Sequence, residues 1–171
     1  MGNLIYLTAT RPDISFAVSY ISRFMSAPKA DHWIAAKRVL RYVRGTPDYG
    51  LLYTRICDPI LSGYIDSDWA GSVDDRKSTA MYVFSLGSGA VTWTSKKQQV
   101  VVISSTEAEY RGAVKASCEA VWLRRMLADM HVSQTGPTPL LCDNQGVLKL
   151  AKNPVFHERT EHVETNCHYI R

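Results

Sequence analysis

The stretch MYVFSLGSGAVTWT at residues 81–94 decides the fold. It contains two runs rich in β-branched and aromatic residues, Met81 to Leu86 and Ala90 to Thr94, joined by Gly87-Ser88-Gly89. Such runs on either side of a glycine-rich turn are typical of a β-hairpin. Residues 60–66 have the same character and are followed by a polar loop, so we expect three antiparallel strands here.

A long helix and one more strand follow the hairpin. Residues 104–130 begin with a serine-rich cap and an acidic first turn, and their apolar side chains recur at helical spacing. Residues 140–143 read as a short apolar strand ending in an acid, and we expect helices over 145–152 and 159–171. A helical crossover from antiparallel strands into a parallel one predicts an α/β fold of the α+β type, with helices packed on a mixed sheet.

The first third of the chain is basic. Residues 1–55 contain eight Lys or Arg and three Asp, whereas residues 56–171 contain twelve basic and thirteen acidic residues. Pro12 and Asp13 favour a helix start, and a second helix is expected from about Asp31 to Arg44. We therefore expect two domains, a basic helical segment over 1–55 and a mixed-sheet domain over 56–171.

The second of these helices carries the candidate nucleic-acid-binding residues. They are basic: Lys37, Arg38, Arg41 and Arg44. On a helix three of the four form one stripe, and we expect Trp33, Leu40 and Val43 to face inward. A cationic stripe suits a phosphate backbone, and a merely solvated helix face is the alternative interpretation.

Composition excludes several classes of protein as first interpretations. The chain has 171 residues, 46% of them apolar and 21% charged, which is enough for one compact core. It contains no run of 18 apolar residues and no signal-peptide pattern at its start, so we expect no membrane contact and an intracellular location, nucleus or cytoplasm. The four cysteines form no C-x-x-C pair, which excludes a zinc ribbon and a disulfide framework.

Three carboxylates stand where this layout brings chain segments together. Asp66 ends the first strand, Glu109 lies at the start of the long helix, and Asp143 ends the fourth strand. Clustered carboxylates are costly unless cations neutralise them, and hard oxygen ligands select Mg²⁺ or Mn²⁺. Two such ions support phosphodiester hydrolysis, so the pattern predicts a metal-dependent nuclease.

Other acids and histidines have simpler interpretations. We expect Asp68 and Asp75 to be loop acids, Glu107 a helix-start charge and Glu119 a solvated helix acid. Taken singly, Asp66 or Asp143 would also be structural more often than catalytic. A zinc site at the clustered histidines His157, His162 and His168 is disfavoured because their spacing matches no standard pattern. A nucleophilic pair of Cys167 and His168 is rejected, because adjacent helical residues point apart.

Many motifs in order resemble one known family. They are RPDISFAVSYISRF (11–24), HWIAAKRVLRYVRGT (32–46), GYIDSDWAG (63–71), DRKST (75–79), WTSKKQ (93–98), SSTEAEY (104–110), LCDNQ (141–145) and AKNPVFHERTEHVE (151–164). The chain resembles, over nearly its whole length, the ribonuclease H region of copia-type retrotransposon Pol polyproteins, preceded by the end of the reverse transcriptase.

The resemblance implies a fold, an activity and a site. The fold is the ribonuclease H-like mixed sheet, and the activity is divalent-metal cleavage of the RNA strand of an RNA–DNA hybrid. Asp66, Glu109 and Asp143 match the first three catalytic carboxylates of the family, with Glu109 rather than Glu107 in the matching place. The basic helices would then grip the duplex backbone, which proteins recognise by shape and 2′-hydroxyl groups.

The chain also departs from the family pattern. The family has a fifth strand and a later helix carrying a fourth metal-binding Asp; since the sequence stops at Arg171, we expect a C-terminally truncated domain of reduced activity. Glu164 is not assigned to that role. Met81 stands where the family usually has Gly, and its side chain would crowd a close backbone approach.

Two non-enzymatic alternatives stay open. One is a non-catalytic remnant that binds nucleic acid or a protein partner at the open sheet edge, where unpaired backbone groups can pair with another chain. The other is a poorly stable translated fragment without a molecular role.

Overall fold

The computed structural model describes residues 1–72 and 74–152, with side chains up to residue 149. The chain divides into two compact units, Met1–Thr54 and Arg55–Arg171, each with its own buried apolar cluster. The helix expected over residues 159–171 lies outside the described residues. Among the helices that the structure describes, none has the length and apolar composition needed to cross a membrane.

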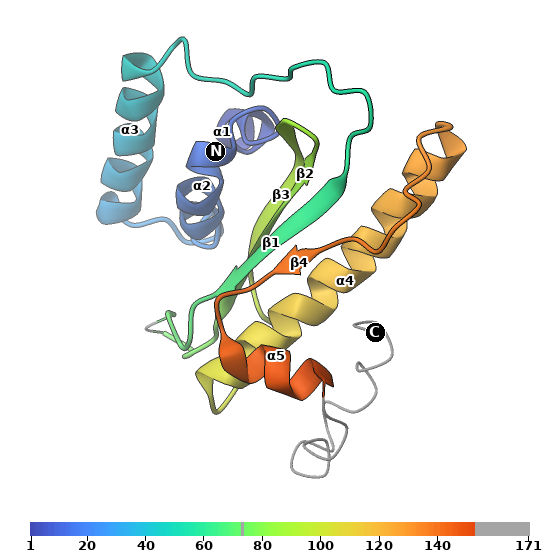
Figure 1. The fold of residues 1–171 in the computed structure, drawn as a ribbon. Coiled ribbons are helices and arrows are strands. Elements are labelled where there is room, and N and C mark those ends of the chain that lie inside the picture. The colour runs from blue at the N-terminus through green and yellow to red at the C-terminus, as the bar shows by residue number, and fades with distance from the viewer. Residues whose placement is uncertain (73, 153–171) are drawn as a thin grey trace. The chain divides into compact units, whose positions relative to one another are not determined.

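The first unit is helical. Its elements are α1 (Gly2–Leu7), the 3-10 turn η1 (Pro12–Ile14), α2 (Ser15–Ser22) and α3 (Ala30–Gly45) (Figure 1). The sequence predicts α2 and α3, and the structure confirms both; it does not predict α1. The core joins all three helices and consists of Leu4, Ile14, Val18, Ile21, Ala36 and Val39.

A buried arginine, Arg11, links the segment before α2 to the residue that follows α3. Arg11 is only 6% exposed, and its guanidinium binds Asp13 with an Nη2 to Oδ2 distance of 2.7 Å. The same group donates to the carbonyl and hydroxyl oxygens of Thr46, just after α3, at 3.0 and 2.8 Å. These bonds satisfy a charge that would otherwise be costly to bury.

The inward face of α3 differs from the prediction. Trp33 and Leu40, expected to face inward, are 61% and 49% exposed, whereas Ala36 and Val39 are buried and Val43 packs partly against the core. The apolar residues of this helix cover more than one face, so periodicity alone does not fix its rotation. The small side chain of Ala36 packs into the core with the neighbouring helices, whereas the bulky indole of Trp33 stays largely exposed.

The second unit is built on a mixed sheet. It contains β1 (Leu61–Ser67), β2 (Thr79–Leu86), β3 (Gly89–Lys97) and the two-residue β4 (Leu140–Leu141), in the order β3-β2-β1-β4 (Figure 1). The three long strands pair antiparallel, and β4 joins β1 in parallel. The mixed α/β sheet predicted from the sequence is therefore confirmed.

A glycine explains why residues 81–94 turn between β2 and β3. Gly87, between β2 and β3, has a φ of +62°, in the left-handed region that glycine enters at little cost. The register then aligns Val83 of β2 with Trp93 of β3. This tight connection confirms the hairpin expected from the glycine-rich segment.

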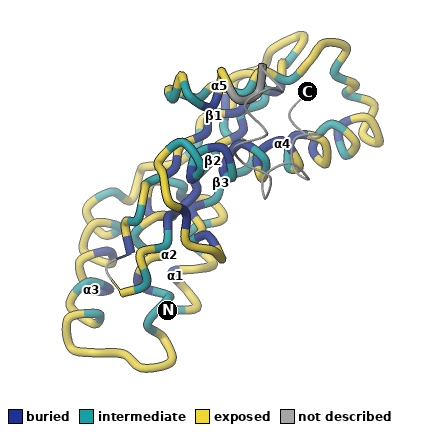
Figure 2. The backbone as a smooth tube through the Cα atoms, turned by 90° about the horizontal axis from the view of Figure 1, so that it is seen from below, coloured by how far each residue is buried: buried dark blue, intermediate teal, exposed yellow. Residues whose placement is uncertain are grey.

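One helix covers one face of the sheet. α4 (Ser105–Asp129) packs against β1 and β2, and α5 (Gln145–Lys152) follows β4 (Figure 1). The core between α4 and the strands includes Leu61, Phe84, Tyr110, Ala116 and Leu123. Figure 2 shows the buried backbone concentrated in the antiparallel strands and in stretches of α4.

A glycine sets how closely α4 approaches the sheet. A Cβ atom on Gly112 would lie 2.5 Å from the Oγ atom of Ser67 on β1. This distance is far below van der Waals contact, so a larger residue would require the Ser67 hydroxyl or the helix to shift. The start of α4 is thereby held against the end of β1.

Candidate active site

The ends of β1 and β4 bring two of the predicted acids to one edge of the sheet. In the parallel pair, Gly63 lies opposite Leu140 and Tyr64 opposite Leu141. Asp66 follows Tyr64 by two residues, and Asp143 follows Leu141 by two. Adjacent strands lie about 4.8 Å apart, and these two run parallel, so Asp66, near the end of β1, and Asp143, just after β4, lie at the same end of the sheet.

Glu109 reaches this edge from the first turns of α4. The helix begins at a serine cap, where the Glu107 backbone N–H donates to Ser104 Oγ at 3.1 Å. Asn144 Nδ2 donates to Glu109 Oε1 at 2.9 Å, and the Cys142 thiol donates to Glu109 Oε2 at 3.4 Å. The carboxylate is therefore held by the two residues on either side of Asp143.

Three potential ligand atoms converge at this point. One atom each from Glu109, Cys142 and Asp143 lies within 4.8 Å of the others. Asp143 is exposed, while Glu109 and Cys142 are half-buried. Two carboxylates at this spacing offer the hard oxygen donors that Mg²⁺ and Mn²⁺ prefer, with solvent access on one side.

The thiol in this group has a raised pKa. Partial burial is the main cause, and the nearby carboxylates of Glu109 and Asp143 add to it. Cys142 therefore stays a neutral thiol and acts as a hydrogen-bond donor to Glu109.

Asp66 is not part of this convergent group. Its side chain is exposed, and burial alternates along β1, with Leu61, Gly63 and Ile65 buried beneath α4. Alternation therefore puts Asp66 on the other face, together with Tyr64. The structure thus brings Glu109 and Asp143 together and leaves Asp66 beside them on the adjacent strand.

The other acids serve local structure. Asp68 accepts a hydrogen bond from the Thr79 backbone, which closes the loop before β2. Asp75 pairs with Lys97 at 2.9 Å, and its pKa is held well below its usual range, mainly by a hydrogen bond from Ser72 and by Lys97. Glu107 caps its own helix and pairs with Arg111 at 3.1 Å.

Glu119 differs from the solvated acid expected. It is half-buried and accepts a hydrogen bond from Thr92 Oγ1 at 3.4 Å. Burial, with the Glu119 charge in addition, raises the pKa of Tyr82 to about 12. The carboxylate therefore belongs to the contact between α4 and the sheet.

Sequence reasoning missed Cys142 and Asn144 as partners of Glu109. Both flank Asp143 in the LCDNQ motif, which is the only local signal that could have pointed to them. Their role depends on the approach of α4, which no local pattern predicts.

The candidate nucleic-acid-binding residues on α3 all have exposed side chains: Lys37, Arg38, Arg41 and Arg44. The Lys37 ammonium lies 5.3 Å from the ring centre of Trp33, a cation–π contact. The exposed indole thus adds an aromatic surface to the basic face.

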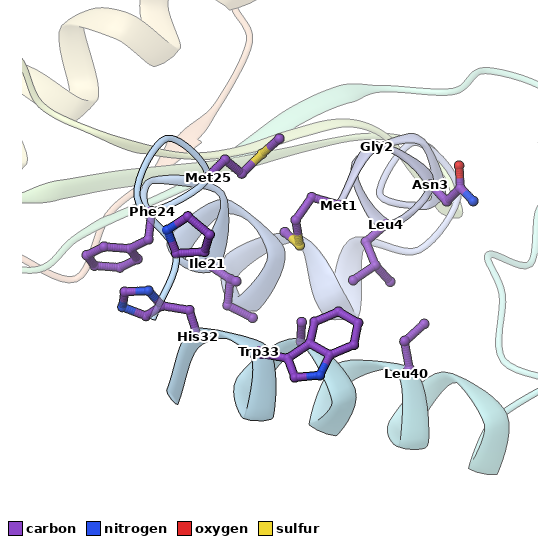
Figure 3. A pocket seen from close by; sticks show the side chains of 12 residues that line it. Met1, Gly2, Asn3, Leu4, Ile21, Phe24, Met25, His32, Trp33 and Leu40 are labelled. Carbon is purple, nitrogen blue, oxygen red and sulfur yellow. The ribbon is translucent and has the colours of Figure 1, made fainter. Parts of the chain in front are cut away.

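A pocket opens beside that indole. It has a volume of about 390 Å³, and Trp33, Leu40 and Leu4 are among the residues that line it (Figure 3). Phe24 and His32 stack at its rim with ring centres 4.0 Å apart. The two residues expected in the core of α3 therefore line an open apolar pocket instead.

Several predicted features fall on residues outside those that the structure describes. They are the histidines His157, His162 and His168, the Cys167–His168 pair and Glu164. Their interpretations stay predictions.

Comparison with known proteins identifies the family. The chain is 46% identical over 171 residues to the retrovirus-related Pol polyprotein from transposon RE2 of Arabidopsis thaliana and 45% identical to that from transposon RE1 of the same plant, covering all of this chain and 12% of each relative. It is also 51% identical over 124 residues to secreted RxLR effector protein 161 of Plasmopara viticola, covering 72% of this chain and 87% of that protein.

No family model matches the chain, and no solved structure gives a significant match. The Pol relatives are nevertheless matched along the whole of this chain, which spans about one eighth of their length. The chain belongs to the retrovirus-related Pol polyproteins of copia-type transposons and corresponds to a segment of such a polyprotein.

Proposed function

We propose that the second unit is a ribonuclease H-like domain that hydrolyses the RNA strand of RNA–DNA hybrids. The observation that carries this proposal is the convergence of Glu109 and Asp143, distant in the sequence, to within 4.8 Å at the ends of β1 and β4. The strand order, with three antiparallel strands and a helical crossover into a parallel one, agrees with the fold that the family resemblance implies.

The carboxylates would suit Mg²⁺ or Mn²⁺. Glu109 and Asp143 would hold metal, and Asp66, which follows Tyr64 as Asp143 follows its register partner Leu141, would contribute from the side of Asp143. Divalent ions in such a site supply charge neutralisation at the scissile phosphate and an activated water. The soft sulfur of a thiol makes Cys142 a poor ligand for these hard ions, so its thiol supports Glu109 instead.

The chain's own residues would orient the site. Asn144 and Cys142 each donate to one oxygen of Glu109 and so fix the direction of the carboxylate. Gly112 lets α4 lie close to β1, which keeps Glu109 near the strand ends. Such supporting contacts hold ligating carboxylates in the orientation that metal binding needs.

The basic face of α3 supports substrate binding. Lys37, Arg41 and Arg44 would contact phosphates of the hybrid, without reading base identity. Such hybrids form during reverse transcription, so the proposed substrate is an intracellular nucleic acid.

A cleavage assay tests the proposal. The purified chain is incubated with a hybrid labelled on the RNA strand, with Mg²⁺ or Mn²⁺, and in parallel with duplex DNA and duplex RNA. We expect cleavage of the hybrid only, with loss of cleavage in Glu109→Gln and Asp143→Asn. The matched control Asp129→Asn removes an exposed acid at the far end of α4 and should cleave like the parent.

Binding without cleavage is the second candidate function. It is favoured by one observation, that Asp66 lies outside the convergent group. In that case the hybrid binds in a salt-dependent manner, and no metal produces cleavage. If the partner is a protein, it would pair with β4, which lies at one edge of the described sheet.

A further inference from the structure

A second cavity lies beside α4, away from the candidate carboxylates. It has a volume of about 300 Å³ and opens between the loop after β3 and the first half of the helix. Its lining residues come from these two segments: Gln98, Gln99, Val100, Arg111, Val114 and Lys115. None of Asp66, Glu109 and Asp143 lines it, so it is a separate feature of the second unit.

One wall of the cavity is firmly held. Gln98 is 3% exposed; its backbone N–H donates to the Ser78 carbonyl at 2.7 Å, and its side-chain amide donates to the Ala108 carbonyl at 2.8 Å. The Oε1 atom of the same side chain is buried and has no hydrogen-bond partner among the described residues. A buried acceptor without a donor is costly, and a bound water or a hydroxyl-bearing ligand would satisfy it.

The helical wall carries an excess of positive charge. Lys115 lies one helical turn after Arg111, on the same side of α4. Arg111 uses its Nε atom on Glu107 at 3.1 Å, whereas Lys115 forms no ion pair within the part of the chain that the structure describes. Glu119, one turn further on, accepts from Thr92 rather than from Lys115.

Lys96, an exposed residue of β3, does not line the cavity, but its charge acts on Lys115 from the sheet. The charges of Lys96 on β3 and of Arg111 both lower the pKa of Lys115, after partial burial as the main cause. Like charges and desolvation disfavour the ammonium form, and a nearby anion would reverse both effects. Binding an anion in the cavity would therefore lower the electrostatic free energy of these cations.

We propose that this cavity binds a phosphate group, held by Lys115 and by the Nη groups of Arg111 that are not bonded to Glu107, with Lys96 on β3 adding positive charge nearby. A guanidinium offers paired donors to phosphate oxygens, and lysine adds point charge. The identification of the ligand as backbone phosphate of an RNA–DNA hybrid rests on the proposed function; a free phosphate ion shares the same chemistry.

The test uses the full chain and leaves out divalent metal, so that cleavage plays no part. Affinity for a fluorescently labelled hybrid is measured over a range of salt concentrations for the parent, Lys115→Gln, Lys96→Gln and Arg125→Gln. Arg125 is exposed on α4, ten residues beyond Lys115, and removing it removes the same charge from the same helix. A second arm follows the side-chain amine of Lys115 by nuclear magnetic resonance in inorganic phosphate and in chloride of equal ionic strength.

We expect the slope of log affinity against log salt to fall by ~0.7–0.9 in Lys115→Gln and in Lys96→Gln, with an affinity loss of about fivefold at about 0.1 M salt, and no change in Arg125→Gln. We also expect inorganic phosphate to raise the pKa of Lys115. A raised pKa of Lys115 in phosphate, together with unchanged salt slopes for the hybrid, identifies free phosphate as the ligand. Unchanged slopes together with an unchanged Lys115 titration overturn the proposal, and absence of cleavage in the earlier assay leaves it standing.

Discussion

Asn144 joins two parts of the candidate site, because its side chain donates from Nδ2 to Glu109 Oε1 at 2.9 Å while its Oδ1 accepts from the backbone of Gly146 at 2.7 Å. The residue therefore orients the carboxylate and caps the start of α5 at the same time. Its neighbour Asp143 is thereby held at the end of β4, next to Glu109.

Replacing Asn144 by Asp separates these two roles. Aspartate is as good a helix cap as asparagine, so we expect little change in stability. It cannot donate to Glu109 and adds a like charge there, so hybrid cleavage should fall about 10-fold to 100-fold. Cleavage rate and chemical denaturation are measured on the same preparation.

The control for this substitution is Ser104→Ala, which removes the cap of α4. It should cost about 1 kcal/mol of stability and leave the cleavage rate close to that of the parent. A rate in Asn144→Asp equal to that of the parent would contradict the orienting role.

Gly112→Ala tests the close approach of α4 to β1. The added Cβ would lie 2.5 Å from Ser67 Oγ, so we expect a loss of about 1–3 kcal/mol in the free energy of unfolding. Part of this loss should return in the Ser67→Ala background, where that oxygen is absent. The control is Gly136→Ala, where an added Cβ meets nothing within 4 Å. Equal stability of the two variants would contradict the packing argument.

The pair of Arg11 and Asp13 predicts how the first unit responds to acid. A hydrogen bond from Arg11 holds the pKa of Asp13 below its ordinary value. The resulting stability is present above the unfolded-state pKa of about 3.9 and is lost as the pH falls through the folded-state value. The protection factors of the amides in α2 and α3, which correct for the pH dependence of intrinsic exchange, should therefore fall in acid.

Asp13→Asn should flatten this acid dependence, because the titrating carboxylate is gone. Asp48→Asn, at an exposed site in the same unit, should retain it. Identical pH profiles for the parent and Asp13→Asn would show that the pair does not contribute.

The basic face of α3 predicts a salt-dependent contribution to hybrid binding. Single substitutions Lys37→Gln, Arg41→Gln and Arg44→Gln should each reduce the slope of log affinity against log salt by ~0.7–0.9 if each contacts one phosphate. Arg55→Gln, an exposed basic residue outside the helix, is the control. Unchanged slopes in all three would favour a solvated helix face.

The strands and the long helix could be predicted because short-range patterns determine them. β-branched runs around Gly87 dictate the hairpin, and the serine cap with its apolar spacing dictates α4. The position of Glu109 and Asp143 at one end of the unit follows from the order of these elements. The sequence could therefore predict that Glu109 and Asp143 lie together, but not that Asp66 lies outside their group.

Features that depend on tertiary packing could not be predicted in this way. Trp33 and Leu40 stay exposed because, together with Leu4 of α1, a helix with no clear sequence signal, they line an open pocket and not a closed core. The partners of Glu109 depend on how near Gly112 lets α4 come. In each case a contact between distant segments decides the outcome.

A crystal soaked in Mn²⁺, with anomalous scattering recorded, tests the central claim most directly. The account predicts metal peaks within coordinating distance, about 2.2 Å, of carboxylate oxygens of Asp66, Glu109 and Asp143, and their loss in Asp143→Asn. Peaks confined to other acids, or no peak at the ends of β1 and β4, would contradict it.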